Sequence, residues 1–221
     1  EDPSASAESA LLCLDQGDLD GATQHIDAAS IRGEGAIVSY VRGNIAANQG
    51  HLKAAKSYFD EAIETDPTHV RARLNRASIH MASGNAQDAL DDANVLLELA
   101  PGLALAKLRR AEANMMLTNW EAAKDDLEVI IEDAPHHHHA LTQLAACYIS
   151  MDRPEKAEAP LNEALRLAPD HTDAWHQRGL LYLDWGREEA ALNDFEAAVR
   201  CDGSHLDARL HIAAIHHEAK R

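Results

Sequence analysis

Apolar residues recur along the chain at helical spacing, in stretches of about 13 residues that short turns separate. The stretches repeat with a longer period, because Pro67, Pro101, Pro135 and Pro169 follow one another at intervals of 34 residues. Three further series share this period: Gly43, Ala77, Ala111, Ala145, Gly179 and Ala213; Ala55, Ala89, Ala123, Ala157 and Ala191; Phe59, Ala93, Leu127, Leu161 and Phe195. Four series with one period indicate an internal structural repeat.

Glycine and proline divide each repeat into two helices. Glycine separates the two apolar stretches at Gly50, Gly84 and Gly186, and Thr118 and Asp152 take the matching places in two other repeats. We expect the residue at this place to end the first helix in a left-handed backbone conformation. Proline ends the second helix because it lacks an amide donor and clashes with the preceding turn.

The pattern resembles the tetratricopeptide repeat family. One repeat carries an almost complete family signature at Trp175, Gly179, Tyr182, Gly186, Ala191 and Phe195, and another carries it at Gly43, Gly50, Ala55, Phe59, Ala62 and Pro67. The resemblance implies an all-α fold, a right-handed superhelical solenoid of antiparallel helix pairs, with first helices on the concave face. The chain departs from the family at Arg42, Arg76, Arg110 and Arg178, where a large apolar residue is usual. The sequence therefore does not determine how side chains pack around these four arginines.

We assign five full repeats, at 36–69, 70–103, 104–137, 138–171 and 172–205. Residues 1–35 are predicted to form a diverged first repeat, in which Gly17 and Ala22 keep the expected relation one residue short. Residues 206–221 are predicted to form a capping or truncated helix. Each repeat of such an array contacts only its neighbours, and an uncapped end makes end-to-end self-association possible.

Composition limits the possible partners. The chain is 46% hydrophobic but only 4% aromatic, and its formal net charge is −17. Phosphate groups would be repelled over most of such a surface, so we expect no nucleic-acid partner. No apolar run reaches the length that a membrane span requires, so we expect no membrane insertion.

Basic residues concentrate on two predicted first helices. A basic set of Arg71, Arg73, Arg76, Lys107, Arg109 and Arg110 contains six of the 20 lysines and arginines. A local positive field in an acidic protein would attract an acidic peptide or a terminal carboxylate, which arginine binds in a bidentate manner. Alternatively, Arg73, Arg76 and Arg110 pack their stems between helices and pair with neighbouring acids.

The family frame predicts which side chains face the partner. Positions four apart share one face of a helix. The mixture of amides, leucines and arginines suits an extended peptide, because amides bind its backbone and leucines its apolar side chains. The predicted partner-binding residues are Tyr40, Asn44, Asn48, Arg71, Leu74, Asn75, Ser78, Leu105, Leu108, Arg109, Glu112, Met116, His139, Thr142, Gln143 and His176, with Asp173 and Leu180 beside them.

One subset of the family clamps the acidic C-terminal tails of heat-shock chaperones with two lysines, two asparagines and an arginine. Asn44, Asn75 and Arg109 match three of these five places, whereas Tyr40 and Leu105 stand where the lysines belong. The asparagines are common in the family generally, so the match to this subset is weak.

Histidine and cysteine offer little chemistry. The run His136, His137, His138 and His139 is a weak candidate for a metal site, because consecutive side chains entering a helix point in different directions. His69, His137, His171 and His205 occupy equivalent turns, which indicates a preference of the repeat. Cys13, Cys147 and Cys201 are far apart and odd in number, so we expect small buried apolar side chains rather than disulfides.

No catalytic or phosphate-binding signature is present, so the sequence predicts a protein-binding scaffold that is not an enzyme and needs no cofactor. Two alternatives stay open: the recognition arm of a larger enzyme, motivated by the missing initiator methionine and a possible cut after Arg221, and a histidine-based metal-binding protein. Two locations also stay open, the cytoplasm and a bacterial periplasm or envelope after removal of a signal segment.

Overall fold

The protein is all-α in the part of the chain that the computed structural model describes, residues 3–30 and 35–218. The helices are α1 (Pro3–Asp15), α2 (Leu19–Ser30), α3 (Ala36–Asn48), α4 (Leu52–Thr65), α5 (Val70–Ala82), α6 (Ala86–Leu99), α7 (Ala104–Met116), α8 (Trp120–Asp133), α9 (His138–Ser150), the short 3₁₀ helix η1 (Pro154–Lys156), α10 (Glu158–Leu167), α11 (Thr172–Asp184), α12 (Glu188–Cys201) and α13 (Leu206–Glu218). Parts of the predicted terminal repeats, residues 1–2, 31–34 and 219–221, lie outside the described residues.

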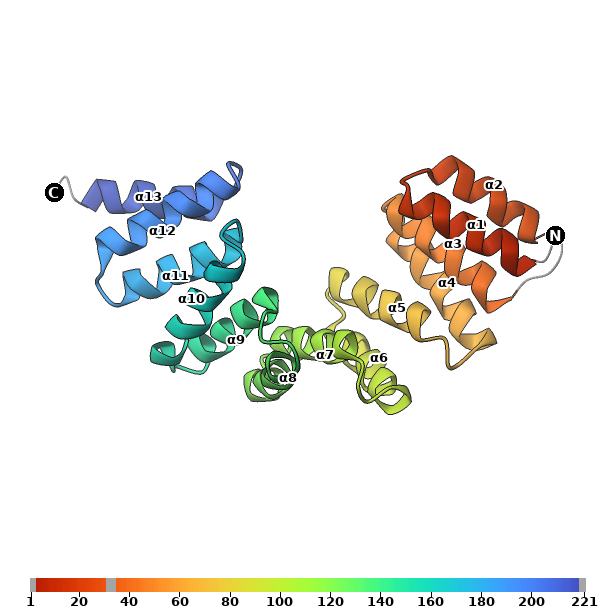
Figure 1. Cartoon of the computed structure of the whole chain (residues 1–221), viewed down its shortest axis with the longest axis horizontal. Coiled ribbons are helices and arrows are strands. Elements are labelled where there is room, and N and C mark those ends of the chain that lie inside the picture. Colours follow the sequence, from red (N-terminus) through yellow and green to blue (C-terminus); the bar gives the residue numbers. More distant parts are fainter. Residues whose placement is uncertain (1–2, 31–34, 219–221) are drawn as a thin grey trace. The chain divides into compact units, whose positions relative to one another are not determined.

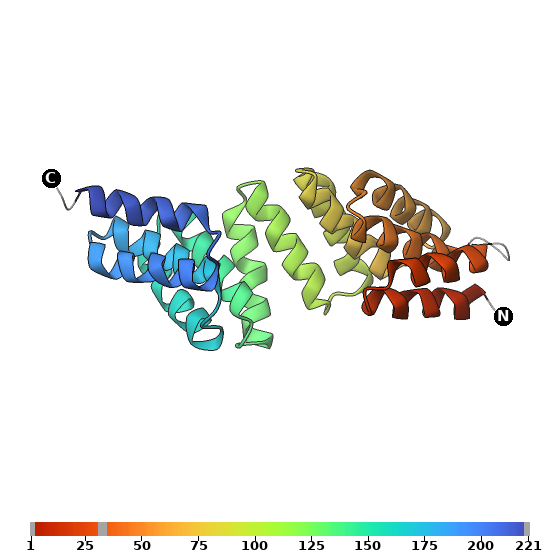
Figure 2. The same cartoon turned by 90° about the horizontal axis from the view of Figure 1, so that it is seen from above.

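The chain forms two compact units, Glu1–Ala113 (unit 1) and Asn114–Arg221 (unit 2), which divide within α7. In unit 1, α1 packs against α2 and α3, and each helix from α3 to α5 packs against the next. In unit 2, the same sequential packing runs from α8 to α13. Consecutive helices in each unit lie side by side and antiparallel (Figures 1 and 2). Two helices fall within each predicted full repeat, while the repeat boundaries themselves stay a prediction.

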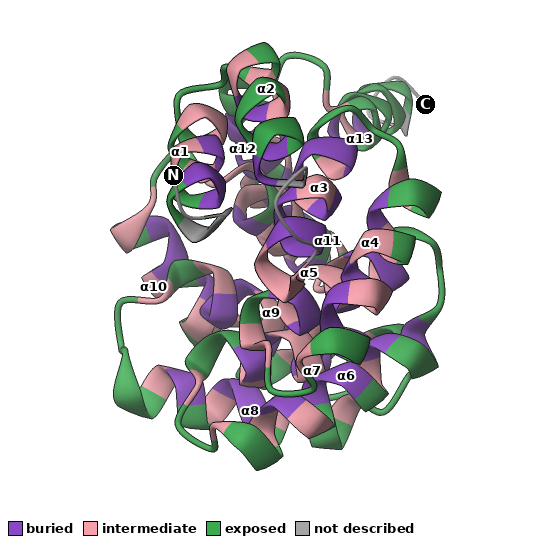
Figure 3. Cartoon of the chain, turned by 90° about the vertical axis from the view of Figure 1, so that its right-hand side faces the viewer, coloured by how far each residue is buried: buried purple, intermediate pink, exposed green. Residues whose placement is uncertain are grey.

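Small and large residues of the repeat fit together in the core. Phe59 and Phe195 are completely buried, and their rings occupy the space where a side chain at Gly43 or Gly179 would begin. A Cβ atom added at Gly179 would lie 2.7 Å from the Phe195 ring. The buried residues line the helix faces that meet neighbouring helices (Figure 3). Glycine therefore allows the closest helix approach in the repeats that carry phenylalanine.

The turns within the repeats adopt the left-handed backbone that the sequence predicted. Gly50, Gly84 and Gly186 have φ angles of 76°, 77° and 68°, and the non-glycine residues Thr118 and Asp152 have φ angles of 61° and 59°. This conformation is strained for an L-residue, above all for a β-branched one such as threonine.

We expect Thr118→Gly to stabilise the protein by up to about 1 kcal/mol, because glycine removes the left-handed strain at only a modest cost in chain entropy. Gly84→Ala, at the matching turn, is the reverse control and should destabilise by a similar amount. Urea unfolding followed by circular dichroism measures both changes. A destabilising Thr118→Gly change would show that threonine contributes more through its contacts than it costs in strain.

Histidines begin several first helices, which explains their recurrence in the sequence. The Nδ1 atoms of His69, His137 and His205 accept hydrogen bonds from the backbone N–H of Ala72, Ala140 and Ala208 at 3.1, 3.1 and 3.2 Å. His171 occupies the same N-cap place before α11. A neutral imidazole thus satisfies a backbone donor that the helix itself leaves unpaired.

Candidate functional site

The first helices of unit 1 line a hollow of about 330 Å³, which we call the unit 1 hollow. Four of its residues belong to the predicted partner-binding set: Tyr40, Asn44 and Asn48 from α3 and Arg71 from α5. The other three, Leu11, Leu14 and Asp15, come from α1. Sequence reasoning missed them because the predicted first repeat departs from the family pattern, although Leu11 and Asp15 are four residues apart and share a helix face.

Hydrogen bonds and ring contacts fix the floor of the unit 1 hollow. The side chain of Asn75 donates to Asn44 Oδ1 at 2.6 Å, and that of Asn48 donates to the Asn44 carbonyl at 2.9 Å. Tyr40 is buried, and its ring centroid lies 4.9 Å from that of His69. Asn44 thus accepts one hydrogen bond from Asn75 at its side chain and one from Asn48 at its backbone carbonyl. These bonds hold the side-chain amides of α3 and α5 in one arrangement.

Polar groups at the edge of the unit 1 hollow reach solvent. Asn48 and Arg71 are exposed, and Arg71 makes no ion pair with any residue in the described ranges. Leu74 and Ser78, further along α5, are half-buried, and the Ser78 hydroxyl donates to the Leu74 carbonyl at 3.2 Å. The guanidinium of Arg71 is therefore the basic group of this hollow that an anionic ligand can reach.

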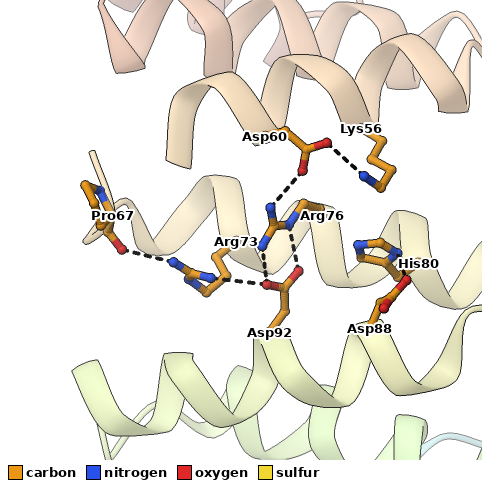
Figure 4. A network of polar contacts seen from close by, with 8 residues as sticks. All are labelled: Lys56, Asp60, Pro67, Arg73, Arg76, His80, Asp88 and Asp92. Carbon is orange, nitrogen blue, oxygen red and sulfur yellow. Dashed lines mark hydrogen bonds and ion pairs between the residues drawn. The ribbon is translucent and has the colours of Figure 1, made fainter. Parts of the chain in front are cut away.

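An arginine network takes two members of the basic set into the interior of unit 1 (Figure 4). Arg73 and Arg76 both contact Asp92 Oδ1, at 3.2 and 2.6 Å, and the Arg76 Nε donates to Asp92 Oδ2 at 2.9 Å. Arg73 also donates to the Pro67 carbonyl at 3.1 Å, and Asp92 is only 3% exposed. The alternative that Arg73 and Arg76 pair with neighbouring acids therefore holds, and they do not offer charge to a partner.

The network extends to α4 through a second carboxylate. Arg76 contacts Asp60 at 2.7 Å, and Lys56 contacts the other oxygen of Asp60 at 2.8 Å. The hydrogen bonds that Arg76 donates to Asp92 and Asp60 raise the pKa of Arg76 above its ordinary value despite partial burial. Burial alone would raise the pKa of Asp60, but the hydrogen bonds from Lys56 and Arg76 outweigh it and lower that pKa. Both groups are thus charged under all ordinary conditions.

The remaining predicted partner-binding residues of unit 1 lie on α7. Arg109 contacts Glu112 at 2.6 Å, which neutralises its charge locally. Leu108 is buried, whereas Leu105 is 42% exposed. Arg109 is therefore less available to an acidic partner than the sequence suggested.

Unit 2 contains a different, mostly apolar hollow of about 320 Å³ between α9 and α11, which we call the unit 2 hollow. Ile149 and Leu180 at its edge are each 37% exposed. Its lining residues are Ala146, Ile149, Ser150, Pro154, Gln177, Leu180, Leu181 and Asp184. Of the residues singled out from the sequence, Leu180 lines it.

Apart from Leu180, the structure places the predicted residues of unit 2 outside this hollow. Thr142 is buried and donates to the His138 carbonyl at 3.0 Å, and Gln143 Nε2 lies 3.1 Å from His139 Nε2. His176 packs against Phe195. Met116, on the unit 2 side of the division, is 46% exposed. Helical spacing predicted that these residues share one face. Instead, Thr142 and Gln143 make contacts within α9, and His176 packs against an aromatic ring.

The histidine run divides among separate roles. His136 is exposed, His137 caps α9, and the ring of His138 meets that of His171 at 5.0 Å. Within residues 3–30 and 35–218, no three His, Cys, Asp or Glu side chains are arranged to hold a metal ion.

The three cysteines are free, as expected, but only Cys147 is fully buried. Burial raises the pKa of the Cys147 thiol to about 11. Cys13 is half-buried and Cys201 is exposed, so the expectation of three buried cysteines was wrong. Cys201 ends α12, where its thiol lies 3.7 Å from the Pro169 carbonyl.

Comparison with known families agrees with this architecture. Tetratricopeptide repeat models match residues 40–104, 105–137 and 144–217. The chain belongs to the tetratricopeptide repeat family. A search of curated protein sequences gave no match. Membership indicates a protein–protein interaction scaffold, and no helix in the described ranges has both the length and the apolar character of a membrane span.

Solved tetratricopeptide repeat structures share the fold. TTC0263 of Thermus thermophilus is 23% identical, with a TM-score of 0.68 over 81% of this chain and 98% of that one. YrrB, described as having an unusual peptide-binding site, is 20% identical, with a TM-score of 0.62 over 81% of this chain and 92% of that one. MamA residues 41 to the end from Desulfovibrio magneticus RS-1 are 18% identical, with a TM-score of 0.69 over 79% and 98%.

Two of the arginines that depart from the tetratricopeptide repeat pattern, Arg76 and Arg178, join successive second helices. Arg76 reaches Asp60 and Asp92, each 16 residues away. In unit 2, Arg178 contacts Asn162 at 2.7 Å and Asp194 at 2.7 and 2.8 Å, again 16 residues to either side. The sequence itself contains this signal, because a polar residue recurs 16 residues to either side of both arginines.

Proposed function

We propose that this tetratricopeptide repeat protein is a non-catalytic scaffold that binds an extended, acidic segment of a partner protein along its first helices. The proposal rests on the unit 1 hollow, where the accessible guanidinium of Arg71 stands beside a fixed set of amides. Arginine binds a carboxylate through two parallel hydrogen bonds, and amide side chains pair with a peptide backbone.

The arrangement also favours one orientation of the ligand. Asp15 lines the same hollow from α1 and repels a second carboxylate, while it accepts hydrogen bonds from donors. An acidic side chain or terminal carboxylate is thus best placed at Arg71, with backbone N–H groups turned toward Asp15 and the α3 amides. Leu11 and Leu14 supply apolar contact for a side chain between them.

The unit 2 hollow supports the same proposal with a different kind of contact. Its lining is mainly apolar, and Gln177 offers a side-chain oxygen that is buried without a hydrogen-bond partner. A protein segment would satisfy both features by placing an aliphatic side chain in the hollow and a backbone N–H at Gln177. The peptide-binding site named for YrrB is a precedent for this activity in a protein of the same fold.

Titration of the ¹⁵N-labelled protein with short peptides tests the proposal. The panel contains an acidic octapeptide with a free C-terminus, its C-terminal amide, and the counterpart in which Asn and Gln replace Asp and Glu. We expect the acidic peptides to shift the resonances of Asn44, Asn48 and Arg71. Loss of a charge-assisted hydrogen bond should make Arg71→Ala bind about 10-fold more weakly.

Lys53→Ala is the matched control, because Lys53 is an exposed base on α4 of the same unit and its removal changes the net charge equally. It should bind like the unaltered protein. Equal affinities for Arg71→Ala and Lys53→Ala, or equal affinities for the acidic peptide and its Asn and Gln counterpart, would overturn the assignment of the acidic ligand to the unit 1 hollow.

A further inference from the structure

Three histidines converge over a buried phenylalanine near the end of unit 2. His176 of α11 lies with its ring centroid 4.7 Å from that of His205 and 5.7 Å from that of His211. His211 of α13 stacks on Phe195 of α12 at 4.8 Å with an angle of 15° between the rings. We call His176, His205 and His211 the histidine cluster. It joins α13 to both helices beneath it.

The contacts of the cluster require neutral imidazoles. His205 Nδ1 accepts the hydrogen bond from the Ala208 N–H that begins α13, so this nitrogen carries no proton. His176 Nε2 is buried and has no hydrogen-bond partner. A protonated imidazole must place a donor on each nitrogen, and a charged group without partners is costly to bury. Protonation therefore removes the cap of α13 and introduces charge beside Phe195.

The charged groups around His176 act in opposite directions. Asp173 on α11 and Asp207 on α13 favour its protonated form, whereas His205 and His211 oppose it, and α12 contributes the uncharged Phe195. Burial has the largest influence, and with the two neighbouring histidines it lowers the pKa of His176 below the ordinary value. The two carboxylates therefore do not compensate for burial.

The apolar contact of α13 with unit 2 is small. Ala208 and Ile215 are its buried apolar residues, and they join Phe195, Ala191 and Ala198 in one small core cluster. Leu206 and Leu210 on the same helix are 65% and 58% exposed. The histidine cluster thus adds ring contacts from His205 and His211 to a small apolar contact between α13 and the rest of unit 2.

We propose that the histidine cluster makes the docking of α13 onto α11 and α12 dependent on pH. Docking is strongest when the three imidazoles are neutral and weakens when they take up protons. The consequence is that α13 is released in mild acid, which exposes the face of Phe195 that His211 covers. The proposal concerns the stability of one helix, and it is independent of the function proposed for the unit 1 hollow.

The direction of the pH effect follows from the lowered pKa of His176. The unfolded or undocked histidine binds a proton at about pH 6.5, and the docked one only at lower pH. Stability from this group is fully present above about pH 6.5, and it is lost as the pH falls through the lower pKa of the docked state. Proton uptake on undocking thus favours release of α13 in this window.

Hydrogen exchange and NMR titration test the proposal on the full chain. Exchange of α13 amides is compared with that of α5 amides in the same sample, which removes the intrinsic effect of pH on exchange. Between pH 7.5 and 5.5 we expect the protection of α13 to fall several-fold relative to that of α5, because undocking takes up a proton at His176 in this range. The double variant His205→Asn/His211→Phe keeps a capping side chain and the ring stack without the charges. Its α13 amides should lose much less protection over the same pH range.

His216→Gln/His217→Gln is the matched control, because both histidines are exposed in the last turn of α13. It should behave like the unaltered protein. An equal loss of α13 protection in His205→Asn/His211→Phe and the unaltered protein would overturn the proposal. If that variant does not fold, the imidazole resonances of the unaltered protein decide: His176 must titrate below pH 6.5, and a midpoint at or above this value refutes the mechanism.

Discussion

Asp92→Ala is expected to lower the free energy of unfolding by about 3–5 kcal/mol, because removal of one partner from a buried ion pair leaves uncompensated charge. Two arginines depend on this carboxylate, and the side chains of Arg73 and Arg76 are only 10% and 19% exposed. Asp60 still pairs with Arg76, but Arg73 keeps only the Pro67 carbonyl. The change is measured by urea unfolding, with helix content followed by circular dichroism.

Glu163→Ala is the matched control for this carboxylate. Glu163 contacts Arg166 at 2.7 Å, a distance like that from Arg76 to Asp92, but its side chain is 39% exposed and that of Arg166 is 62% exposed. Exposed pairs contribute little, so removal of Glu163 should leave the free energy of unfolding almost unchanged. Similar effects of Asp92→Ala and Glu163→Ala would contradict the assigned role of the arginine network.

Asp194→Ala provides a graded comparison in unit 2. Arg178 contacts both carboxylate oxygens of Asp194, and it retains Asn162 after the change. Because one arginine rather than two loses its carboxylate, the expected destabilisation is smaller than that of Asp92→Ala. Repeat arrays can unfold in more than one step, so the m value of each transition identifies the unit that is affected.

Phe59→Ala is expected to cost about 3–5 kcal/mol, since it leaves a cavity in a closely packed core. The ring of Phe59 is completely buried and fills the space beside Gly43. Gly43→Ala works in the opposite sense, because its new methyl group would collide with that ring, and overpacking of this kind costs about 1–3 kcal/mol. Urea unfolding of both variants gives the two values.

A double-mutant cycle tests whether these two positions share one space. Gly43→Ala with Phe59→Leu should be more stable than the sum of the single changes predicts, because the smaller side chain makes room for the methyl group. The chain itself contains this combination, since Ala145 and Leu161 occupy the same repeat places and belong to one buried cluster. Strict additivity would show that the core adjusts at the two positions independently.

The polar residues divide into those that the sequence could place and those that it could not. Tyr40, Asn44 and Asn48 are four residues apart, so helical spacing together with the family resemblance predicted that they share one face of α3, and all three line the unit 1 hollow. Arg73 and Arg76 were harder, because a basic residue on a first helix can face a partner or an internal acid. Their partner Asp92 lies on α6, 19 and 16 residues further along.

The same distinction applies to histidine. The sequence showed that His69, His137 and His205 hold equivalent turns, and the local backbone explains their shared capping role. It did not show that His176 and His211 meet His205 over Phe195, because this meeting depends on how α11, α12 and α13 pack. A side chain's charge state and function there depend on neighbours from three helices.

By itself, the sequence determined the helices, the turns between them and the repeating core, because helix periodicity, left-handed turns and proline stops act over a few residues. Tertiary structure alone decided which charges stay accessible, how Leu11 and Asp15 complete the unit 1 hollow, and which histidines form a cluster. The physical reason is that burial and pairing depend on groups brought together from different helices, whose side-chain directions no local pattern specifies.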